Sequence, residues 1–391
     1  MLRITTKQRQ NWRQLAEEYG FKFHTMYGQT YWDESAYYQF TLEQIERDLE
    51  SPTEELHQMC LEVVDKVVND EALLQLFRIP EQHWQFVADS WHGQDPSLYS
   101  RLDLSYSGKG SAKLLENNAD TPTSLYETGF WQWLWLQNKV DSGAISRGAD
   151  QFNSLQEKLV QQCHLIAQHY QLDTLHFACC RDTEEDRGTV QYIQDCAKEA
   201  GLHSPFMFVE DIGLSDRGFF TDLEDHTIQA MFKLYPWEFM LNEEFGDHLN
   251  SAQVHWLEPP WKAILSNKAL LPQLWKMFPG HPNLLPAWFE HEIHQANSQF
   301  LAKKIVKKPL FSREGANISI IENGVDMVST QGPYGEEGYI YQEFTPMPQF
   351  DNNYTLIGSW LVDGQAAGIS IREDKQSITQ DLSRYLPHII L

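Results

Sequence analysis

The stretch Ser100-Arg-Leu-Asp-Leu-Ser105 continues through Tyr-Ser-Gly-Lys-Gly-Ser-Ala into Lys113-Leu-Leu-Glu-Asn-Asn118, and this stretch decides the fold. Apolar and polar residues alternate on both sides of a segment that contains two glycines, which is typical of a β-hairpin. The segment lacks the first glycine of a phosphate-binding loop and has no strand-to-helix context, so we interpret it as a turn. Two antiparallel strands are therefore expected here.

The predicted hairpin gathers charged side chains on one face. With the turn centred on the Lys-Gly pair, Asp103 lies opposite Glu116 and Arg101 lies opposite Asn118. Two carboxylates that face each other repel unless a positive charge neutralises them. One candidate is Mg²⁺, which prefers hard oxygen ligands together with nucleotide phosphates. The other is Arg101, pairing with the acids on a solvated hairpin.

The composition indicates a globular and acidic protein. The 391 residues are 42% hydrophobic and 13% aromatic, which is enough for a large core. A formal net charge of −25 argues against nucleic acid as a partner, because neutralising phosphates needs a basic surface. We see no secretory signal and no apolar run near the roughly 18 residues of a membrane span. Five cysteines without a CxxC spacing favour neither a disulfide framework nor a zinc ribbon. A cytoplasmic protein without a membrane partner is expected.

The hydrophobic pattern predicts helices and strands within one multi-lobed unit, residues 1–391. Apolar residues at three- and four-residue steps predict helices over 41–78, 123–139, 152–170 and 187–200. The last of these helices lies between predicted strands at 175–180 and 206–209, which is typical of a βαβ unit. Short strands separated by glycines are predicted at 304–325, 338–345, 353–362 and 365–373. We expect an α/β lobe over about 150–260 and a glycine-rich β lobe over about 265–375.

Four segments carry a family likeness: Ser100-Arg-Leu-Asp103, Leu114-Leu-Glu-Asn-Asn-Ala-Asp-Thr-Pro-Thr-Ser124, Lys308-Pro-Leu-Phe-Ser-Arg-Glu-Gly-Ala-Asn317 and Gly368-Ile-Ser-Ile-Arg-Glu-Asp374. In this order, over nearly the whole chain, they resemble the glutathionylspermidine synthase family, most of all its single-domain bacterial acid–amine ligases. Nothing corresponds to the amidase domain of bifunctional members. The resemblance implies an α+β fold, with an ATP-grasp-like catalytic core and an additional α/β substrate-binding lobe. It also implies ATP-driven formation of an amide bond.

The resemblance implies roles for the hairpin and the residues just after it. Arg101 matches the arginine that touches the transferred phosphoryl group and the substrate carboxylate. Thr121 matches a position that contacts the peptide-like substrate. The family usually has an aromatic residue where this chain has Asn117. Three residues match the family's magnesium ligands, in agreement with the geometry derived above: Asp103, Glu116 and Asn118.

The resemblance also implies where ATP binds. Two lysines match nucleotide-binding lysines, and as compact point charges they suit phosphate oxygens: Lys268 and Lys308. The lysines at 303, 304, 307 and 308 alternatively form a solvated basic face. Gly315 lies in a turn between strand-like runs, where backbone N–H groups can approach phosphates. Arg372 matches an arginine beside the phosphates that stabilises charge on an acyl phosphate, and its alternative is a structural role at a strand end. The segment Gln342-Glu343-Phe344 matches the family segment whose backbone holds the adenine. The alternative is an ordinary edge strand.

Acidic residues after the buried strand suggest a place for an amine. Glu184 and Glu185 belong to a charged loop at a position where α/β proteins bind ligands. Their carboxylates suit the ammonium groups of a polyamine, and the alternative is a solvated loop. Weaker candidates of the same sort are Lys233, Tyr235 and Glu238.

Together these assignments predict an enzyme, an ATP- and Mg²⁺-dependent carboxylate–amine ligase that acts through an acyl phosphate. Its acid would be glutathione or another peptide carboxylate, and its amine would be spermidine or a related polyamine. The alternative is a non-catalytic nucleotide- or polyamine-binding protein that retains the fold.

Overall fold

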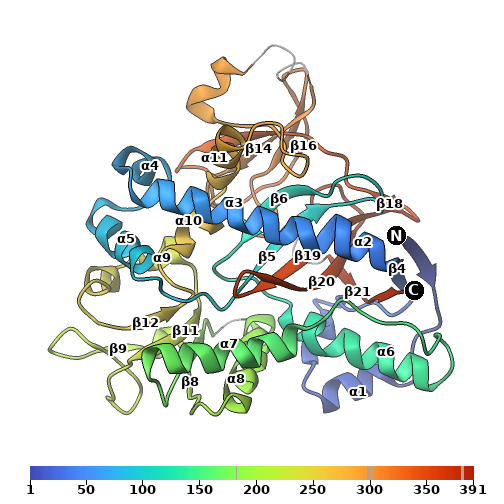
Figure 1. The fold of residues 1–391 in the computed structure, drawn as a ribbon, viewed down its shortest axis with the longest axis horizontal. Helices are drawn as coiled ribbons and strands as arrows, with labels where there is room; N and C mark the ends of the chain where they lie inside the picture. The colour runs from blue at the N-terminus through green and yellow to red at the C-terminus, as the bar shows by residue number, and fades with distance from the viewer. Residues whose placement is uncertain (182, 297–299, 301–302, 380–382) are drawn as a thin grey trace.

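The predicted hairpin lies in a six-stranded sheet at the centre of the computed structural model (Figure 1). The structure describes residues 1–181, 183–296, 300, 303–379 and 383–391. Each strand of the sheet is antiparallel to its neighbours, and β18 (Gln349–Phe350) pairs with β19 at the side. The main order is β21 (Arg384–Leu386), β20 (Gln365–Asp374), β19 (Asn353–Val362), β5 (Tyr99–Ser105) and β6 (Lys113–Asn118).

The predicted helices are present, with bounds that differ by a few residues. The segment 41–78 forms α2 (Leu42–Ile45), the π-helical η2 (Glu46–Glu50), α3 (Ser51–Val68) and α4 (Glu71–Leu76). The other three predicted helices are η4 (Glu127–Trp131) with α6 (Gln132–Asp141), α7 (Leu155–Tyr170) and α8 (Glu184–Glu199). Shorter helices are α1 (Trp12–Glu18), α5 (Trp84–His92), α9 (Trp237–Met240), α10 (Lys262–Ser266) and α11 (Leu270–Met277).

The two faces of the central sheet differ because side chains alternate along each strand. Leu102 and Leu104 of β5 belong to the main hydrophobic core, which also contains the buried side of α3. Tyr99 belongs to a second core with α7, and the Arg101 guanidinium lies over the ring of Trp360 from that same core. The alternation therefore separates an apolar face beneath α3 from a face that carries Arg101 and Asp103.

A parallel sheet forms the lower α/β layer of Figure 1 and contains the predicted βαβ unit. The unit runs from β7 through α8 to β8, and β7 is central and fully buried. Helices α7 and α8 pack together beside this sheet, sharing the second core with β7. The sheet order is β12 (His255–Leu257), β11 (Ala230–Leu234), β7 (His176–Cys179) and β8 (Phe206–Phe208).

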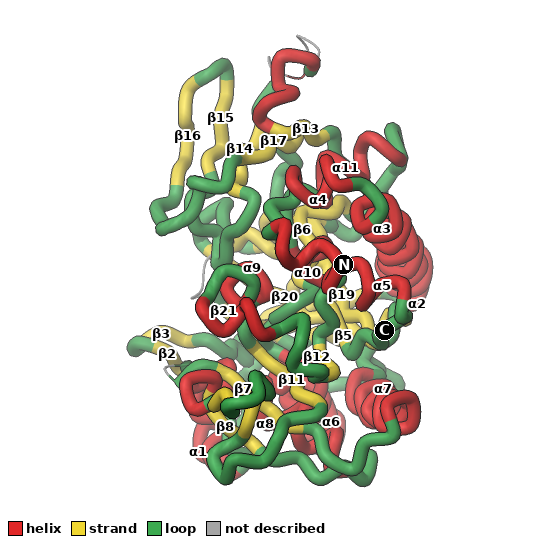
Figure 2. Tube along the Cα trace, turned by 90° about the vertical axis from the view of Figure 1, so that its left-hand side faces the viewer, coloured by secondary structure: helices red, strands yellow, loops and turns green. Residues whose placement is uncertain are grey.

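A third, antiparallel sheet lies at the top of Figure 1. Its strand β17 pairs with a neighbour on each side, so the prediction that 342–344 could be an ordinary edge strand is wrong. Figure 2 shows that the β15–β16 hairpin and the small hairpin of β2 (Thr25–Met26) and β3 (Gln29–Thr30) project on the same side of the molecule. The sheet order is β13 (Ala287–Phe289), β17 (Tyr339–Glu343), β14 (Ile305–Pro309), β15 (Ser319–Glu322) and β16 (Val325–Ser329).

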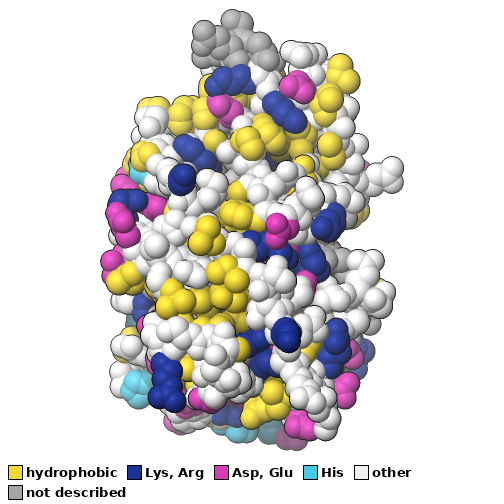
Figure 3. Space-filling view, turned by 90° about the vertical axis from the view of Figure 1, so that its right-hand side faces the viewer, with side chains coloured by type: hydrophobic (Ala, Val, Ile, Leu, Met, Phe, Trp, Pro, Cys, Tyr) yellow, Lys and Arg dark blue, Asp and Glu magenta, His cyan; other side chains and the backbone are white. Residues whose placement is uncertain are grey.

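The two ends of the chain meet in a three-stranded sheet, where β4 (Ala36–Phe40) lies between β1 (Leu2–Thr5) and β22 (His388–Ile390). A two-stranded sheet of β9 (Gly213–Leu214) and β10 (Phe220–Thr221) completes the strands. On the face in Figure 3, basic and acidic side chains are interspersed around bands of hydrophobic ones. Within the described ranges, no helix combines the length and the apolar character needed to cross a membrane.

Candidate active site

The β5–β6 hairpin has the predicted register at its functional end. Asp103 pairs with Glu116 and Arg101 pairs with Asn118. Beyond Asp103 the register shifts, so that Leu104 pairs with Leu114, one residue away from the prediction. The bulge confines the error to the turn side of the hairpin, and residues 106–112 connect the two strands.

Two arginines neutralise the Asp103 carboxylate. The Arg101 Nε lies 2.7 Å from Asp103 Oδ1, and Arg372 Nη2 donates a short hydrogen bond to Asp103 Oδ2. Asp103 is 1% exposed, so these contacts take place away from bulk water. Burial works against both guanidinium charges, but Asp103 more than offsets it and raises the pKa of Arg101 and of Arg372. Arg101 thus pairs with Asp103, which is the arrangement expected as the alternative to a bound metal ion.

Glu116 is neutralised mainly by two lysines, with a smaller contribution from Arg372. Burial would raise the pKa of Glu116, but Lys268, Lys308 and Arg372 more than offset it, so the pKa lies well below its usual range. Lys268 Nζ is 3.2 Å from Glu116 Oε2. Lys308 donates to the carbonyl of Leu115 at 2.9 Å and to Gln342 Oε1 at 2.8 Å. Burial lowers the pKa of Lys308 to about 8, with Glu116 opposing and Lys268 reinforcing that effect.

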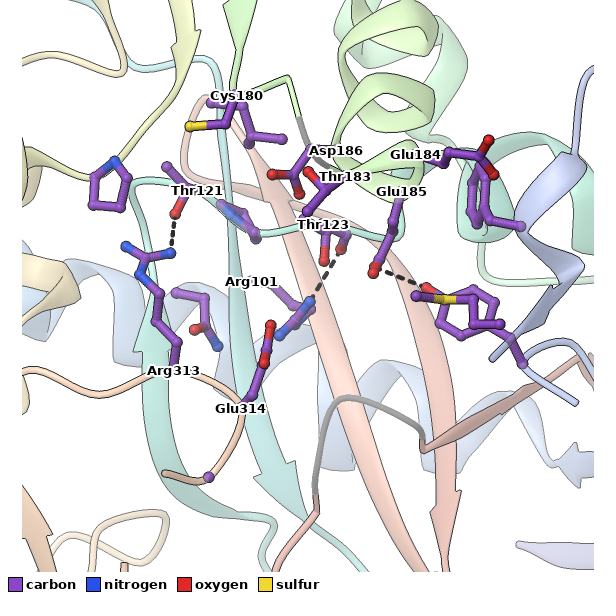
Figure 4. Close-up of a pocket in the computed structure, with 18 of the residues that line it drawn as sticks. Arg101, Thr121, Thr123, Cys180, Thr183, Glu184, Glu185, Asp186, Arg313 and Glu314 are labelled. Carbon is purple, nitrogen blue, oxygen red and sulfur yellow. Dashed lines mark hydrogen bonds between the residues drawn. The ribbon is translucent and has the colours of Figure 1, made fainter. Parts of the chain in front are cut away.

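A cavity of about 610 Å³ opens over these groups. Figure 4 shows its charged lining, with Glu185 reaching in from α8 and Arg313 and Glu314 approaching from the other side. A smaller recess beside it is lined by Lys268 together with Glu116 and Asn118. Eight of the predicted site residues line the large cavity: Arg101, Glu116, Asn118, Thr121, Glu184, Glu185, Gly315 and Arg372.

The loop between β14 and β15 forms one wall of the cavity. Gly315 has φ +70°, and a Cβ there would lie 2.5 Å from the carbonyl oxygen of Thr379, so the position requires glycine. Arg313 of this loop donates to Thr121 Oγ1 at 2.6 Å (Figure 4) and to Glu238 Oε1 at 3.1 Å. The loop is therefore tied to the wall that carries the predicted substrate residue Thr121.

The acidic pair after β7 differs from its prediction. Glu184 and Glu185 form the first turn of α8 rather than a loop, a position where carboxylates interact favourably with the helix dipole. Glu185 also accepts a hydrogen bond from Tyr31, whose hydroxyl lies 2.8 Å from its Oε1. The first turn of the helix places both residues at the cavity, so the loop part of the alternative is wrong, while Glu184 itself is exposed to solvent.

Comparison with known proteins identifies the family. A family model described as glutathionylspermidine synthase preATP-grasp matches residues 3–391. The chain belongs to the glutathionylspermidine synthase family. It is 40% identical to a "Putative acid--amine ligase" of Haemophilus influenzae, over 92% of this chain and 91% of that protein.

More distant relatives are longer than this chain. A bifunctional glutathionylspermidine synthetase/amidase of Escherichia coli is 26% identical, over 92% of this chain and 60% of that protein. A trypanothione synthetase of Crithidia fasciculata is also 26% identical, over 83% of this chain and 52% of that protein. The chain thus spans little more than half the length of these two. As a member of this synthase family, the chain is an ATP-dependent ligase that forms carbon–nitrogen bonds.

A solved structure shares the fold. The glutathione synthetase-like effector of Globodera pallida superposes with a TM-score of 0.50 at 11% identity, covering 86% of this chain and 88% of that one. This likeness agrees with the mixed α and β architecture predicted from the sequence.

Other predicted residues of the glutathionylspermidine synthase pattern lie outside the large cavity. Asp103 lies behind the two arginines, and Lys308 and Gln342 are buried against the backbone of β6. Glu343 pairs with Lys303 at 2.9 Å, and the Phe344 ring lies under Lys304. The backbone N–H groups of Glu343 and Phe344 donate to the carbonyls of Pro286 and Lys304, at 2.8 and 3.1 Å.

The weaker candidates and the family departure are mostly structural. Lys233 forms a fully buried ion pair with Asp120, and Glu238 holds Arg313. Tyr235 lines the cavity and donates a short hydrogen bond to Glu243. The Nδ2 of Asn117 lies 3.8 Å from the sulfur of Cys60 in α3. The departure from the family pattern therefore lies on the core side of β6.

Several site residues were missed from the sequence. Arg313 belongs to the family segment Lys308–Asn317, but the sequence assigned it no function. Three other site residues lie in stretches without a recognisable motif: Tyr31, Glu127 and Tyr385. Tyr31 and Tyr385 line the cavity, and Glu127 lies directly behind Tyr31, whose hydroxyl is 2.6 Å from its Oε1. Only the folded chain brings together residues separated by 96 and 154 positions.

Proposed function

We propose that this protein joins a carboxylic acid to an amine in an ATP- and Mg²⁺-dependent reaction that passes through an acyl phosphate. The observation that carries the proposal is the pair Arg101 and Arg372, which lies beside Glu116 and Asn118 in a cavity that also contains the carboxylates of α8. Such a cavity offers cations to an acid and its phosphoryl group, and anions to an amine.

The chemistry follows from the weakness of a carboxylate as an electrophile. Transfer of the γ-phosphoryl group of ATP to the acid converts its oxygen into a phosphate leaving group. Arg101 and Arg372 would hold the acid and stabilise the charge that develops on the transferred group and on the tetrahedral adduct. They start from fixed positions because Asp103 orients both guanidiniums.

The donor atoms of the site suit a hard cation. Glu116 and Asn118 lie on the same face of β6 and line the cavity, and their carboxylate and amide oxygens are of the type that Mg²⁺ prefers. Asp103 lies across from Glu116 and is the third proposed ligand for Mg²⁺, and to bind the ion it would have to exchange one of its two guanidinium contacts for it. When bound, the ion would neutralise the phosphates and align the transfer.

Nucleotide binding is proposed between the central sheet and the glycine-containing β lobe, in an ATP-grasp-like arrangement. Lys268 and Lys308 supply positive charge beside Glu116, and the loop at Gly315 brings backbone close to the cavity. The backbone of residues 342–344, at the end of β17, would hold the adenine. We propose a single multi-lobed unit over residues 1–391, with the α/β lobe over about 150–260 and the β lobe over about 265–375.

The substrates are proposed from the names of the relatives and from the charges of the cavity. Glutathione or a similar peptide acid would place its carboxylate at Arg101 and contact Thr121, which Arg313 orients. A polyamine such as spermidine would place an ammonium group at Glu184 and Glu185, whose carboxylates line the same cavity. The reaction would take place in the cytoplasm, where ATP and both substrates are available.

A screen of acids against amines tests the proposal. Purified protein is incubated with ATP, Mg²⁺ and each pair, phosphate release is measured, and products are identified by mass spectrometry. We expect phosphate release that needs both an acid and an amine, together with an amide whose mass is the sum of the two less water. ATP binding without turnover for every pair would contradict the proposal and favour a non-catalytic binding protein.

A further inference from the structure

Three side chains from distant segments form a hydrogen-bonded chain that leads out of the cavity into the protein. The Tyr31 hydroxyl lies 2.8 Å from Glu185 Oε1 and 2.6 Å from Glu127 Oε1. Tyr31 is 2% exposed and Glu127 is completely buried. Figure 4 shows the contact between Glu185 and the neighbouring hydroxyl on the cavity side.

The number of protons in this chain is constrained by its geometry. A phenol has one hydrogen and can donate it to only one carboxylate at a time. Both short contacts are hydrogen bonds only if one of the carboxyl groups also carries a proton. Glu127 Oε2 has no hydrogen-bond partner among the described residues, and a buried ionised carboxylate with a free oxygen is unfavourable. Glu127 is therefore the better place for that proton.

The surroundings of Glu127 agree with this count. Burial and then Glu185 raise the pKa of Glu127 to about 8, while the Tyr31 hydrogen bond and Arg101 oppose the rise. Two further ionisable groups nearby are Tyr126 on its own helix and Tyr385 beside Tyr31, and both have a raised pKa. An ammonium ion beside Glu185 would favour ionisation of the pair, because an opposite charge stabilises carboxylates. The proton that Glu127 holds in the ligand-free protein would then leave through Tyr31 and Glu185 to the water of the cavity, so that Glu127 is ionised when the amine loses its own proton.

We propose that Glu185, Tyr31 and Glu127 form a proton relay that deprotonates the acceptor amine of the ligase reaction. Glu185 contacts the ammonium group, Tyr31 passes the proton on, and Glu127 stores it. The inference rests on the proposed function and adds to it a route for the proton. Glu127 acts through Tyr31 and touches no substrate, so it is a positioning and proton-holding residue.

The proton balance of amide formation requires such an acceptor. An ammonium nitrogen carries three protons, of which one remains on the amide. A second leaves with the phosphate as the bond from the acyl carbon to the phosphate oxygen breaks. The third passes to Glu185 before the nitrogen lone pair attacks the acyl carbon. It is relayed when Tyr31 accepts it and gives its own hydrogen to the ionised Glu127.

A comparison of two amines tests the relay. Spermidine is an ammonium ion near neutral pH and must lose a proton, whereas hydroxylamine is largely neutral and traps an acyl phosphate directly as a hydroxamate. Glutathione serves as the acid probe. In E127Q and Y31F the spermidine rate should fall about 10²-fold relative to the hydroxylamine rate, the size of a general-base effect. In the wild type this ratio should rise with pH around 8, and the rise should vanish in E127Q.

The matched control is D95N, which removes a partly buried carboxyl with a raised pKa that lines a different cavity. Its ratio should equal that of the wild type. Wild-type hydroxamate formation with a ratio that E127Q and Y31F leave unchanged would overturn the relay while sparing the ligase. Absence of hydroxamate with any acid of the screen would contradict the ligase function itself.

Infrared spectroscopy of the ligand-free protein tests the stored proton independently of turnover. Between pH 6 and 9 we expect the C=O stretch of one protonated carboxyl to disappear in the wild type and in D95N. The same change should be missing in E127Q. A difference spectrum of E127Q that equals the wild-type spectrum would overturn the relay, whatever the substrates are.

Discussion

Replacing Asp103 by asparagine should both destabilise the protein and impair catalysis. The substitution keeps the size of the side chain but leaves the buried guanidiniums of Arg101 and Arg372 without their shared carboxylate. Removal of one partner from a buried ionic cluster costs about 3–5 kcal/mol. An unfolding entropy of about 2.1 cal/mol/K per residue gives roughly 0.8 kcal/mol/K for this chain, so the melting temperature should fall by roughly 4–6 °C.

The same substitution should lower ATP-dependent phosphate release by about 10²-fold, the usual effect of misplacing groups that orient a substrate. Circular dichroism melting and a coupled phosphate assay measure the two effects. The matched control is D351N, since Asp351 also pairs with an arginine but its side chain is 67% exposed. Exposed pairs contribute about 0–1 kcal/mol, so this control should melt within roughly 1 °C of the wild type. Equal melting temperatures and rates for D103N and D351N would refute the reasoning.

Three further predictions concern the nucleotide side and Glu127. K308M should weaken binding of a non-hydrolysable ATP analogue about tenfold, as measured by calorimetry. The wild type should lose affinity above pH 8, where Lys308 deprotonates, and K308M should show no such loss. A K308M pH profile equal to that of the wild type would contradict this. G315A should raise the KM for ATP about tenfold, because the new Cβ meets the Thr379 carbonyl and φ is +70°; a wild-type KM would contradict a close approach of this loop to the nucleotide. Because the pKa of Glu127 rises from 4.5 unfolded to about 8 folded, its proton stabilises the folded state below pH 4.5 and this contribution is lost as pH rises to 8. Denaturant unfolding at pH 5.5, 6.5 and 7.5 should show E127Q gaining on the wild type by up to about 1.4 kcal/mol per pH unit, and parallel curves would contradict the shift.

The hairpin was predictable because its signal is local. Arg101 and Asp103 alternate with Leu102 and Leu104, and period-two alternation places the two sets on opposite faces. The register was predicted correctly at Glu116 and wrongly by one residue towards the turn. The one-residue error comes from a β-bulge, which inserts an extra residue into one strand. Counting residues outward from the turn assumes that no such residue is inserted.

The sequence predicted an acidic segment at Glu184 and Glu185 for binding a ligand, but not that this wall of the cavity would be helical. Glu184 and Glu185 were assigned to a loop because charge runs are common in loops, whereas the structure begins α8 with them. The partners of this wall were not predictable at all, since Tyr31 and Glu127 come from segments far from 185 in sequence. Their role depends on which side chains the fold buries together.

The most direct test of the central claim follows oxygen from the acid to the phosphate. The acid found in the screen is labelled with ¹⁸O in its carboxylate and converted with ATP, Mg²⁺ and amine. If the acid is activated as an acyl phosphate, each turnover transfers one carboxylate oxygen, and the released phosphate carries one ¹⁸O by mass spectrometry. Amide formation accompanied by phosphate without ¹⁸O would contradict the account.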